Sequence, residues 1–135
     1  MTALVDTGVL YALADRDDEW HARARQWTTG LRAVLLVPVS VVPEAAYLIR
    51  TRLGSAAERA FVASLAAEEL AIEPLRTADL ARISELMEAY AQIGFVDASV
   101  VATAERLRVS TIATTDRRHF GAVRPRHVPA FTLVP

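Results

Sequence analysis

The chain has 135 residues, a formal net charge of −1 at neutral pH and no cysteine. A chain of this length forms one domain with its own hydrophobic core, and without cysteine it has neither disulfides nor thiolate zinc sites. The near-neutral charge argues against the broad cationic surface of a non-specific nucleic-acid-binding protein.

Two features of the composition bear on location and assembly. The N-terminus lacks a basic region followed by an apolar stretch, and no apolar run approaches the ~18 residues of a membrane helix. We therefore expect a cytoplasmic protein with no membrane partner. The hydrophobic fraction of 53% lies above the usual ~45–50%. This excess favours a homodimer, formed through the helix with Phe61 and Leu65 or the helix with Leu86 and Tyr90.

The first half of the chain predicts two strands and three helices. In chain order these are a strand over 2–5, a helix over 8–29 interrupted by DRDDEWH, a strand over 34–37, a helix between Ser40 and Gly54, and a helix over 56–70. We expect Ser40 to cap the second helix, with Pro43 in its first turn, and Ser55 to cap the third.

The second half continues the alternation of strands and helices. In chain order it predicts a strand over 70–75, a helix over 78–94 capped by Thr77, a helix over 96–108, a strand over 109–115, a loop over 119–125 and a strand over 131–134. The strands are apolar throughout, which is typical of a parallel sheet covered by helices on both faces. We therefore expect a single α/β domain over residues 1–135.

Four acidic residues are predicted to lie at one edge of this sheet. Asp6 and Asp116 directly follow the first and fourth strands, while Glu44 and Asp97 lie in the first turns of helices. Ligands bind beyond the carboxyl ends of the strands in such sheets. Each acid alone could simply cap a helix or complement its dipole. Four converging carboxylates, however, repel one another unless their pKa values rise or a cation lies among them, which favours a divalent cation.

These acids occur in stretches whose order resembles a known family. LVDTGVLYAL, VPVSVVPEAAYLIRTRLG, GFVDASVVATAERLR and IATTDRRHF together resemble the PIN domain, and in particular the VapC-like toxins of bacterial toxin–antitoxin pairs. The resemblance covers essentially the whole chain. It implies a three-layer α/β/α sandwich with a central, mostly parallel sheet of about five strands. It also implies a Mg²⁺- or Mn²⁺-dependent endoribonuclease, a homodimer, and a small antitoxin that binds it in a heterotetramer or larger assembly.

The resemblance also implies the site residues. Asp6, Glu44, Asp97 and Asp116 match the acids of the family, and Thr114 matches its hydroxyl residue. We expect Asp6 and Asp97 to bind the metal directly, while Glu44 and Asp116 complete a second site or hold metal-bound water. Mg²⁺ and Mn²⁺ prefer oxygen ligands, and such an ion would orient the scissile phosphate of RNA and activate a water molecule.

Basic residues that follow Asp116 are weaker candidates for the site than the acids. Arg117 and Arg118 follow it directly, so they are candidates for contacts with the RNA backbone. His119 and His127 are isolated from one another in the sequence, which argues against a histidine metal site.

Other functions fit parts of the pattern. An aspartic protease would need the Asp-Thr-Gly at residues 6–8 in an all-β chain, and an aspartyl phosphatase would need a second Asp where this chain has Gly8. Two alternatives stay open, namely a stand-alone PIN nuclease with no antitoxin and a catalytically silent PIN-like protein that only binds or scaffolds.

Overall fold

The computed structural model describes residues 1–30 and 32–135. Within these residues, five strands form one sheet in the order β3-β2-β1-β4-β5, and all neighbouring strands are parallel. The strands are β1 (Thr2–Val5), β2 (Val34–Pro38), β3 (Ala71–Glu73), β4 (Thr111–Ala113) and β5 (Thr132–Val134). The parallel sheet expected from the apolar strands is confirmed.

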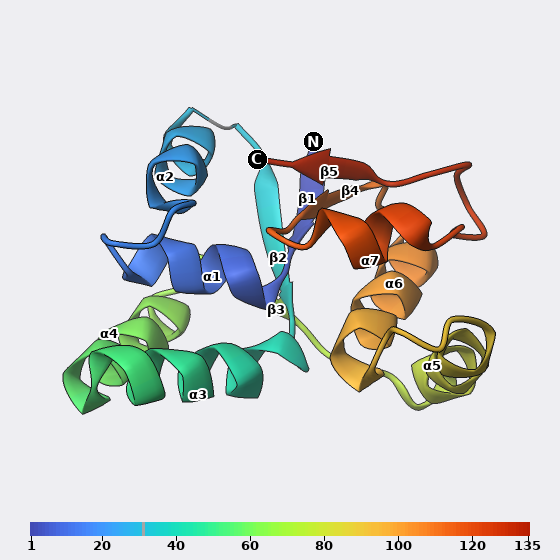
Figure 1. Cartoon of the computed structure of the whole chain (residues 1–135), viewed down its shortest axis with the longest axis horizontal. Helices are drawn as coiled ribbons and strands as arrows, with labels where there is room; N and C mark the ends of the chain where they lie inside the picture. Colours follow the sequence, from blue (N-terminus) through green and yellow to red (C-terminus); the bar gives the residue numbers. More distant parts are fainter. Residues whose placement is uncertain (31) are drawn as a thin grey trace.

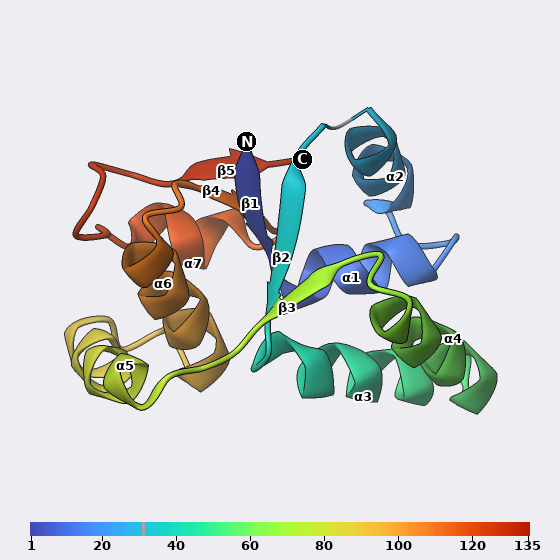
Figure 2. The same cartoon turned by 180° about the vertical axis from the view of Figure 1, so that it is seen from behind.

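Helices cover both faces of the sheet (Figure 1). One group, to the left in Figure 1, contains α1 (Thr7–Ala14), α2 (His21–Thr29), α3 (Val41–Leu53) and α4 (Ser55–Ala66). The other group, to the right, contains α5 (Thr77–Ala89), α6 (Phe95–Leu107) and α7 (Arg117–Ala122). Figure 2 shows the chain crossing from β3, at the sheet edge, to α5 in the second group. The predicted three-layer α/β/α architecture is confirmed.

The core explains why the strands are apolar at successive positions. Leu4 and Val5 on β1 and Ile112 on β4 are at most 1% exposed. Ile49 of α3 and Val100 of α6 are fully buried as well. A strand that has helices on both faces buries its side chains on both faces, so it shows no polar alternation. Across the described ranges, no helix is both long enough and apolar enough to cross a membrane.

The prediction of a loop over 119–125 is wrong in its first part, because α7 continues to Ala122. The helix forms where the side chain of Asp116 accepts a hydrogen bond from the backbone N–H of His119, at 3.0 Å. This bond satisfies one of the free N–H groups of the first turn. An acid that was expected in the site is therefore also a helix cap.

The three predicted hydroxyl caps are wrong in detail. Ser40 precedes α3 but makes no cap bond, since its Oγ lies 2.5 Å from Oγ of Ser99 on α6. Ser55 and Thr77 are the first residues of their helices and do not cap them. The residue before α5, Arg76, instead donates its backbone N–H to the carboxylate of Asp79 at 3.0 Å.

Of the residues that marked the two helices proposed for a dimer interface, Phe61 and Leu86 are buried, while Leu65 and Tyr90 are partly buried. Phe61 and Leu86 are 9% and 0% exposed, because both pack into the core. The exposed apolar side chains of the same two helices are Val62, Leu80 and Met87. The homodimer stays a prediction, and these residues are the better candidates for its contacts.

Candidate active site

The centre of the candidate site is Asp6, which follows β1 and is only 6% exposed. Thr114, fully buried after β4, donates a hydrogen bond from Oγ1 to Oδ2 of Asp6 at 3.0 Å. The same Oγ1 accepts the backbone N–H of Asp116 at 2.9 Å. Because β1 and β4 are neighbouring parallel strands, their carboxyl ends bring the first and last acids together.

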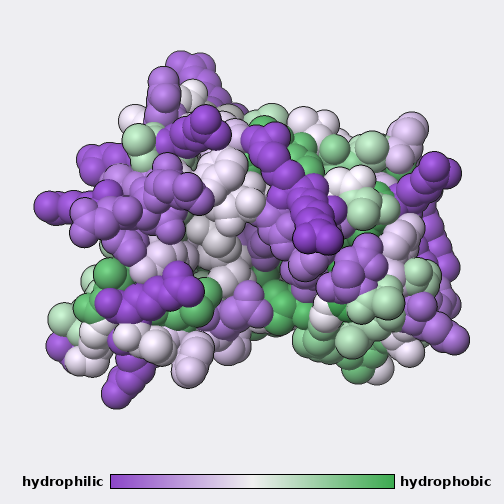
Figure 3. Space-filling model, viewed as in Figure 1, coloured by the Kyte–Doolittle hydropathy of each residue, from purple (hydrophilic) through white to green (hydrophobic). Residues whose placement is uncertain are grey.

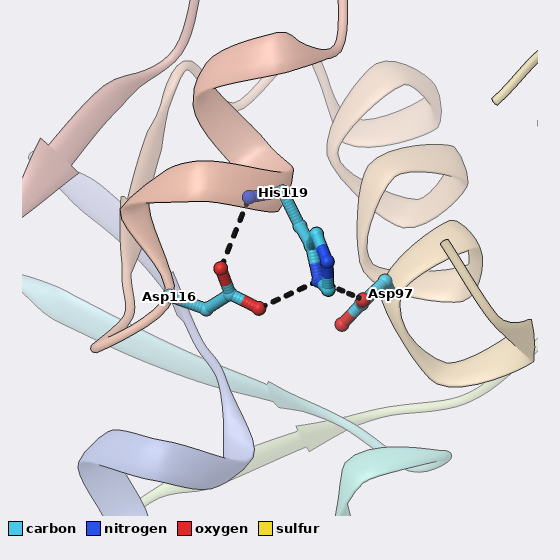
Figure 4. Close-up of side chains that lie close together, drawn as sticks. All are labelled: Asp97, Asp116 and His119. Atoms are coloured by element: carbon cyan, nitrogen blue, oxygen red, sulfur yellow. Dashed lines mark hydrogen bonds and ion pairs between the residues drawn. The ribbon is translucent and has the colours of Figure 1, made fainter. Parts of the chain in front are cut away.

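A second part of the site joins α6 to α7 (Figure 4). Asp97 lies in the first turn of α6, and Asp116 and His119 lie at the start of α7. Nδ1 of His119 is 2.7 Å from Oδ2 of Asp116 and 3.3 Å from Oδ2 of Asp97. One ligand atom from each of the three side chains lies within 4.8 Å of the others. Figure 4 shows the two carboxylates and the imidazole turned toward one another.

The environment of Asp6 disfavours its charged form. The pKa of Asp6 is raised to about 6; burial is the largest cause, and the negative charges of Asp97 and Glu44 contribute to the rise. Hydrogen bonds from the backbone N–H of Thr7 and the hydroxyl of Thr114 lower the pKa, but they do not offset the burial. Asp6 is therefore a carboxylate that a nearby cation would stabilise.

Asp97 lies in a similar environment. Burial is the largest cause of its raised pKa, followed by the negative charge of Asp116, while His119 opposes the rise and Glu44 adds to it. Glu44 itself is exposed in the first turn of α3. The structure thus brings all four predicted acids into one electrostatic neighbourhood, with Glu44 at its exposed side.

The sequence interpretation missed His119. In the sequence His119 lies near Asp116 but far from Asp97 and His127, so a search for paired histidines does not find it. The usable signal was the three-residue spacing from Asp116 to His119, which places both on one side of a helical turn. A loop is expected over 119–125, so the helical spacing of Asp116 and His119 carries no weight in the sequence-based prediction.

Arg117 and Arg118 are both exposed at the start of α7, where Figure 3 shows hydrophilic side chains covering the surface. The guanidinium of Arg117 lies 5.9 Å from the ring centre of Trp20 and donates a hydrogen bond to the carbonyl of Pro135 at 2.5 Å. Arg23 lies 5.2 Å from the same ring. Arg117 is thus engaged in contacts within the fold, whereas Arg118, equally exposed, has no side-chain hydrogen bond or ion pair among those of the described residues.

Gly8, two residues after Asp6, permits a close approach of two segments. A Cβ atom at this position would lie 2.1 Å from Oγ1 of Thr115, which precedes Asp116. The start of α1 therefore packs directly against the loop that follows β4. This contact gives the glycine of the Asp-Thr-Gly a structural role in the site.

The donor set fits a divalent cation. It combines carboxylate oxygens with an imidazole nitrogen, and Nδ1 of His119 is a buried atom with no hydrogen-bond partner among the residues described. Carboxylates suit Mg²⁺ and Mn²⁺, and imidazole suits transition metals. Such an ion would also neutralise the acids whose pKa values are raised.

Comparison with known proteins identifies the family. The sequence profile of the PIN domain matches residues 3–124. The chain belongs to the PIN-domain family. It is 34% identical over 134 residues to Ribonuclease VapC26 of Mycobacterium tuberculosis, an alignment that covers 98% of this chain and 99% of the relative. The resemblance to VapC-like PIN domains is confirmed.

Solved structures share the fold of this PIN domain. The sarcin–ricin-loop-cleaving toxin VapC20 of Mycobacterium tuberculosis matches with a TM-score of 0.84 at 21% identity, over 95% of this chain and 98% of that one. A chain of a toxin–antitoxin complex from Klebsiella pneumoniae matches with a TM-score of 0.69 at 19% identity, over 96% of this chain and 99% of that one.

Proposed function

We propose that this PIN domain is a divalent-cation-dependent endoribonuclease and the toxin of a toxin–antitoxin pair. The observation that carries the proposal is the buried carboxylate of Asp6, whose pKa is raised to about 6 by burial and by nearby acids. A buried carboxylate with other acids nearby destabilises a fold unless a cation balances its charge. The 34% identity to a ribonuclease supports RNA as the substrate.

The residues have separate roles in this proposal. Asp6 and Asp97 would hold the cation directly, and Glu44 and Asp116 would complete a second site or hold water molecules. A bound divalent cation would neutralise charge on the scissile phosphate and lower the pKa of a water molecule. Thr114 orients Asp6 through its hydroxyl and fixes the backbone at Asp116 through the same oxygen.

We assign the RNA backbone contact to Arg118 in preference to Arg117. Both follow Asp116, but Arg117 already contacts Trp20 and a backbone carbonyl. Arg118 is exposed beside the site, and a guanidinium binds phosphate oxygens well. Such an enzyme would act on RNA in the cytoplasm, as the sequence analysis expects.

The antitoxin is the proposed protein partner. The similar chain from Klebsiella pneumoniae comes from a toxin–antitoxin complex. In this chain, a pocket of about 480 Å³ opens between α1, α4 and β2, with apolar side chains that include Leu10, Leu35, Phe61 and Leu70. An apolar side of an antitoxin helix would fit such a surface. The pocket is lined by the second half of α1, from Leu10 to Ala14, whereas Asp6 precedes the first residue of that helix.

The nuclease assignment is tested by cleavage of a single-stranded RNA with Mg²⁺, with Mn²⁺ and with excess chelator. We expect cleavage only with metal, and a loss of about 1,000-fold, or about 4 kcal/mol of barrier, for Asp6→Asn. The exposed Asp17→Asn is the matched control and should cleave like the parent. Equal cleavage in chelator, or an active Asp6→Asn protein, would overturn the metal-dependent assignment. No cleavage of RNA under any of these conditions would favour the silent binding protein.

The antitoxin assignment has a test of its own. A small reading frame beside this gene, encoding a DNA-binding segment and an amphipathic tail, should yield a protein that binds the chain and stops cleavage. Inhibition should be lost when the amphipathic tail is removed. A chain with no such neighbour, active alone, would be the stand-alone nuclease.

A further inference from the structure

His119 brings a nitrogen donor into a site whose predicted ligands are all oxygens. Its Nδ1 atom lies 2.7 Å from one carboxylate oxygen of Asp116 and 3.3 Å from one of Asp97. Two ligands that bind one ion at right angles, with bonds of about 2.1 Å, are about 3.0 Å apart. The two separations fit an ion pair between the imidazole and the carboxylates, and they also fit three atoms that share one cation.

The orientation of these groups supports the same interpretation. Asp116 uses Oδ1 to cap α7 through the backbone N–H of His119, which leaves Oδ2 facing the imidazole. Nδ1 of His119 is buried and lies within ion-pair distance of a carboxylate oxygen from each acid. Here the nitrogen and both oxygens converge.

We propose that His119 is a direct ligand of the divalent cation, together with Asp97 and Asp116, and that its nitrogen makes the site prefer Mn²⁺ to Mg²⁺. Mg²⁺ strongly favours oxygen ligands, whereas imidazole nitrogen is a good ligand for transition metals. The inference rests on the proposed metal-dependent function and extends it. It also decides the role of Asp116, which becomes a direct ligand.

Calorimetric titration of the whole chain with Mn²⁺ and with Mg²⁺ tests the preference. We expect the parent to bind Mn²⁺ about 10-fold more tightly than Mg²⁺, and His119→Ala to lose about 10-fold for Mn²⁺ but less than about 3-fold for Mg²⁺. His119→Asn, which offers an oxygen in place of the nitrogen, should lose the preference for Mn²⁺. His21→Ala, which changes a histidine outside the cluster, is the control and should bind both ions like the parent.

Pulsed electron paramagnetic resonance of the Mn²⁺-loaded parent gives a direct readout that needs no variant to fold. We expect ¹⁴N coupling from a directly bonded imidazole, and its loss in His119→Ala. Absent coupling in the parent would overturn the inference, as would an equal loss of Mn²⁺ and Mg²⁺ affinity in His119→Ala. If Mn²⁺ binds and supports cleavage without ¹⁴N coupling, only the role of His119 fails. If no metal binds, the proposed function fails too.

Discussion

Asp6 and Asp79 are buried aspartates whose surroundings differ. They are 6% and 4% exposed, yet the pKa of Asp6 is raised to about 6 while that of Asp79 is lowered. Burial would raise both. For Asp79, hydrogen bonds and positive charge from Arg106, with the backbone N–H of Arg76, outweigh burial. Burial alone therefore does not set the pKa of an acid, because its partners decide the direction.

The surroundings of Asp79 form an ion-pair network that has a structural purpose. Arg106 on α6 contacts Asp79 on α5 at 3.0 Å and Glu73 on β3 at 2.8 Å. Arg82 on α5 contacts Glu105 on α6 at 2.7 Å. Each of these acids has an arginine within the fold, whereas the acids around Asp6 repel one another. The acids paired with arginine hold the second helical layer together, whereas the acids of the candidate site have no arginine partner among the ion pairs of the described residues and contact His119 instead.

The largest effect on stability should come from breaking the paired region. Arg106→Ala leaves Asp79 and Glu73 without their cation, and we expect it to lower the free energy of unfolding by about 3 kcal/mol. Urea denaturation measures this loss. The exposed Arg59→Ala should change the free energy by less than about 0.5 kcal/mol. A loss below about 1 kcal/mol for Arg106→Ala would show that the network contributes little.

A cation should stabilise the unpaired region almost as strongly. At 100 times its dissociation constant, Mn²⁺ should raise the free energy of unfolding of the parent by about 2.7 kcal/mol. Asp6→Asn should gain much less from Mn²⁺, while its metal-free form should be no less stable than the parent, because one repulsive charge is gone. Melting curves with and without Mn²⁺ measure both. An unchanged response to Mn²⁺ in Asp6→Asn would make Asp6 an ordinary helix cap.

Acidification should change the free energy of unfolding by about 1 kcal/mol through Asp6 before it affects the contribution of Asp79. The folded pKa of Asp6, about 6, exceeds its ordinary value of 3.8. The native state therefore binds more protons than the unfolded state in this range, and metal-free stability should rise by about 1 kcal/mol as pH falls from 7 to 5. Asp79, whose pKa is lowered, loses its contribution only at still lower pH. Melting temperatures of the parent should follow this trend, and those of Asp6→Asn should be flatter. Identical pH profiles would contradict it.

The smallest effect should come from the exposed Arg118. Arg118→Ala should leave the free energy of unfolding within about 0.5 kcal/mol of the parent. It should weaken binding of uncleaved RNA a few-fold and reduce the slope of log affinity against log salt by about 0.7. RNA binding to the Asp6→Asn background, measured at several salt concentrations, tests this. An unchanged slope would remove Arg118 from the RNA contact.

The sheet and the positions of its acids could be predicted because they depend on local patterns. Apolar strands indicate parallel pairing, and parallel pairing sends Asp6 and Asp116 to the same edge. The helices that begin at residues 41 and 95 then bring their first-turn acids to that edge. This reasoning needs only the order of the elements and the direction of the strands.

Side-chain partners could not be predicted in the same way. The bond between Ser40 and Ser99 joins residues 59 positions apart, and the cluster around His119 depends on how α7 packs near α6. Capping propensity considers only the backbone next to a serine, so it predicts that Ser40 caps α3 and does not predict its bond to Ser99. The arginine network has the same character, because Arg106 and Asp79 lie on different helices.

The hydrogen bond from Thr114 to Asp6 spans 108 positions of the sequence. The N-terminus of a growing chain leaves the ribosome first. A contact between residues that lie far apart in the sequence forms only after both residues have emerged. Unfinished chains therefore contain Asp6 and Glu44 but have no assembled site. For a protein proposed to cut RNA, this topology confines the activity of each chain to the time after synthesis has passed α7, so a nascent chain is not itself a nuclease.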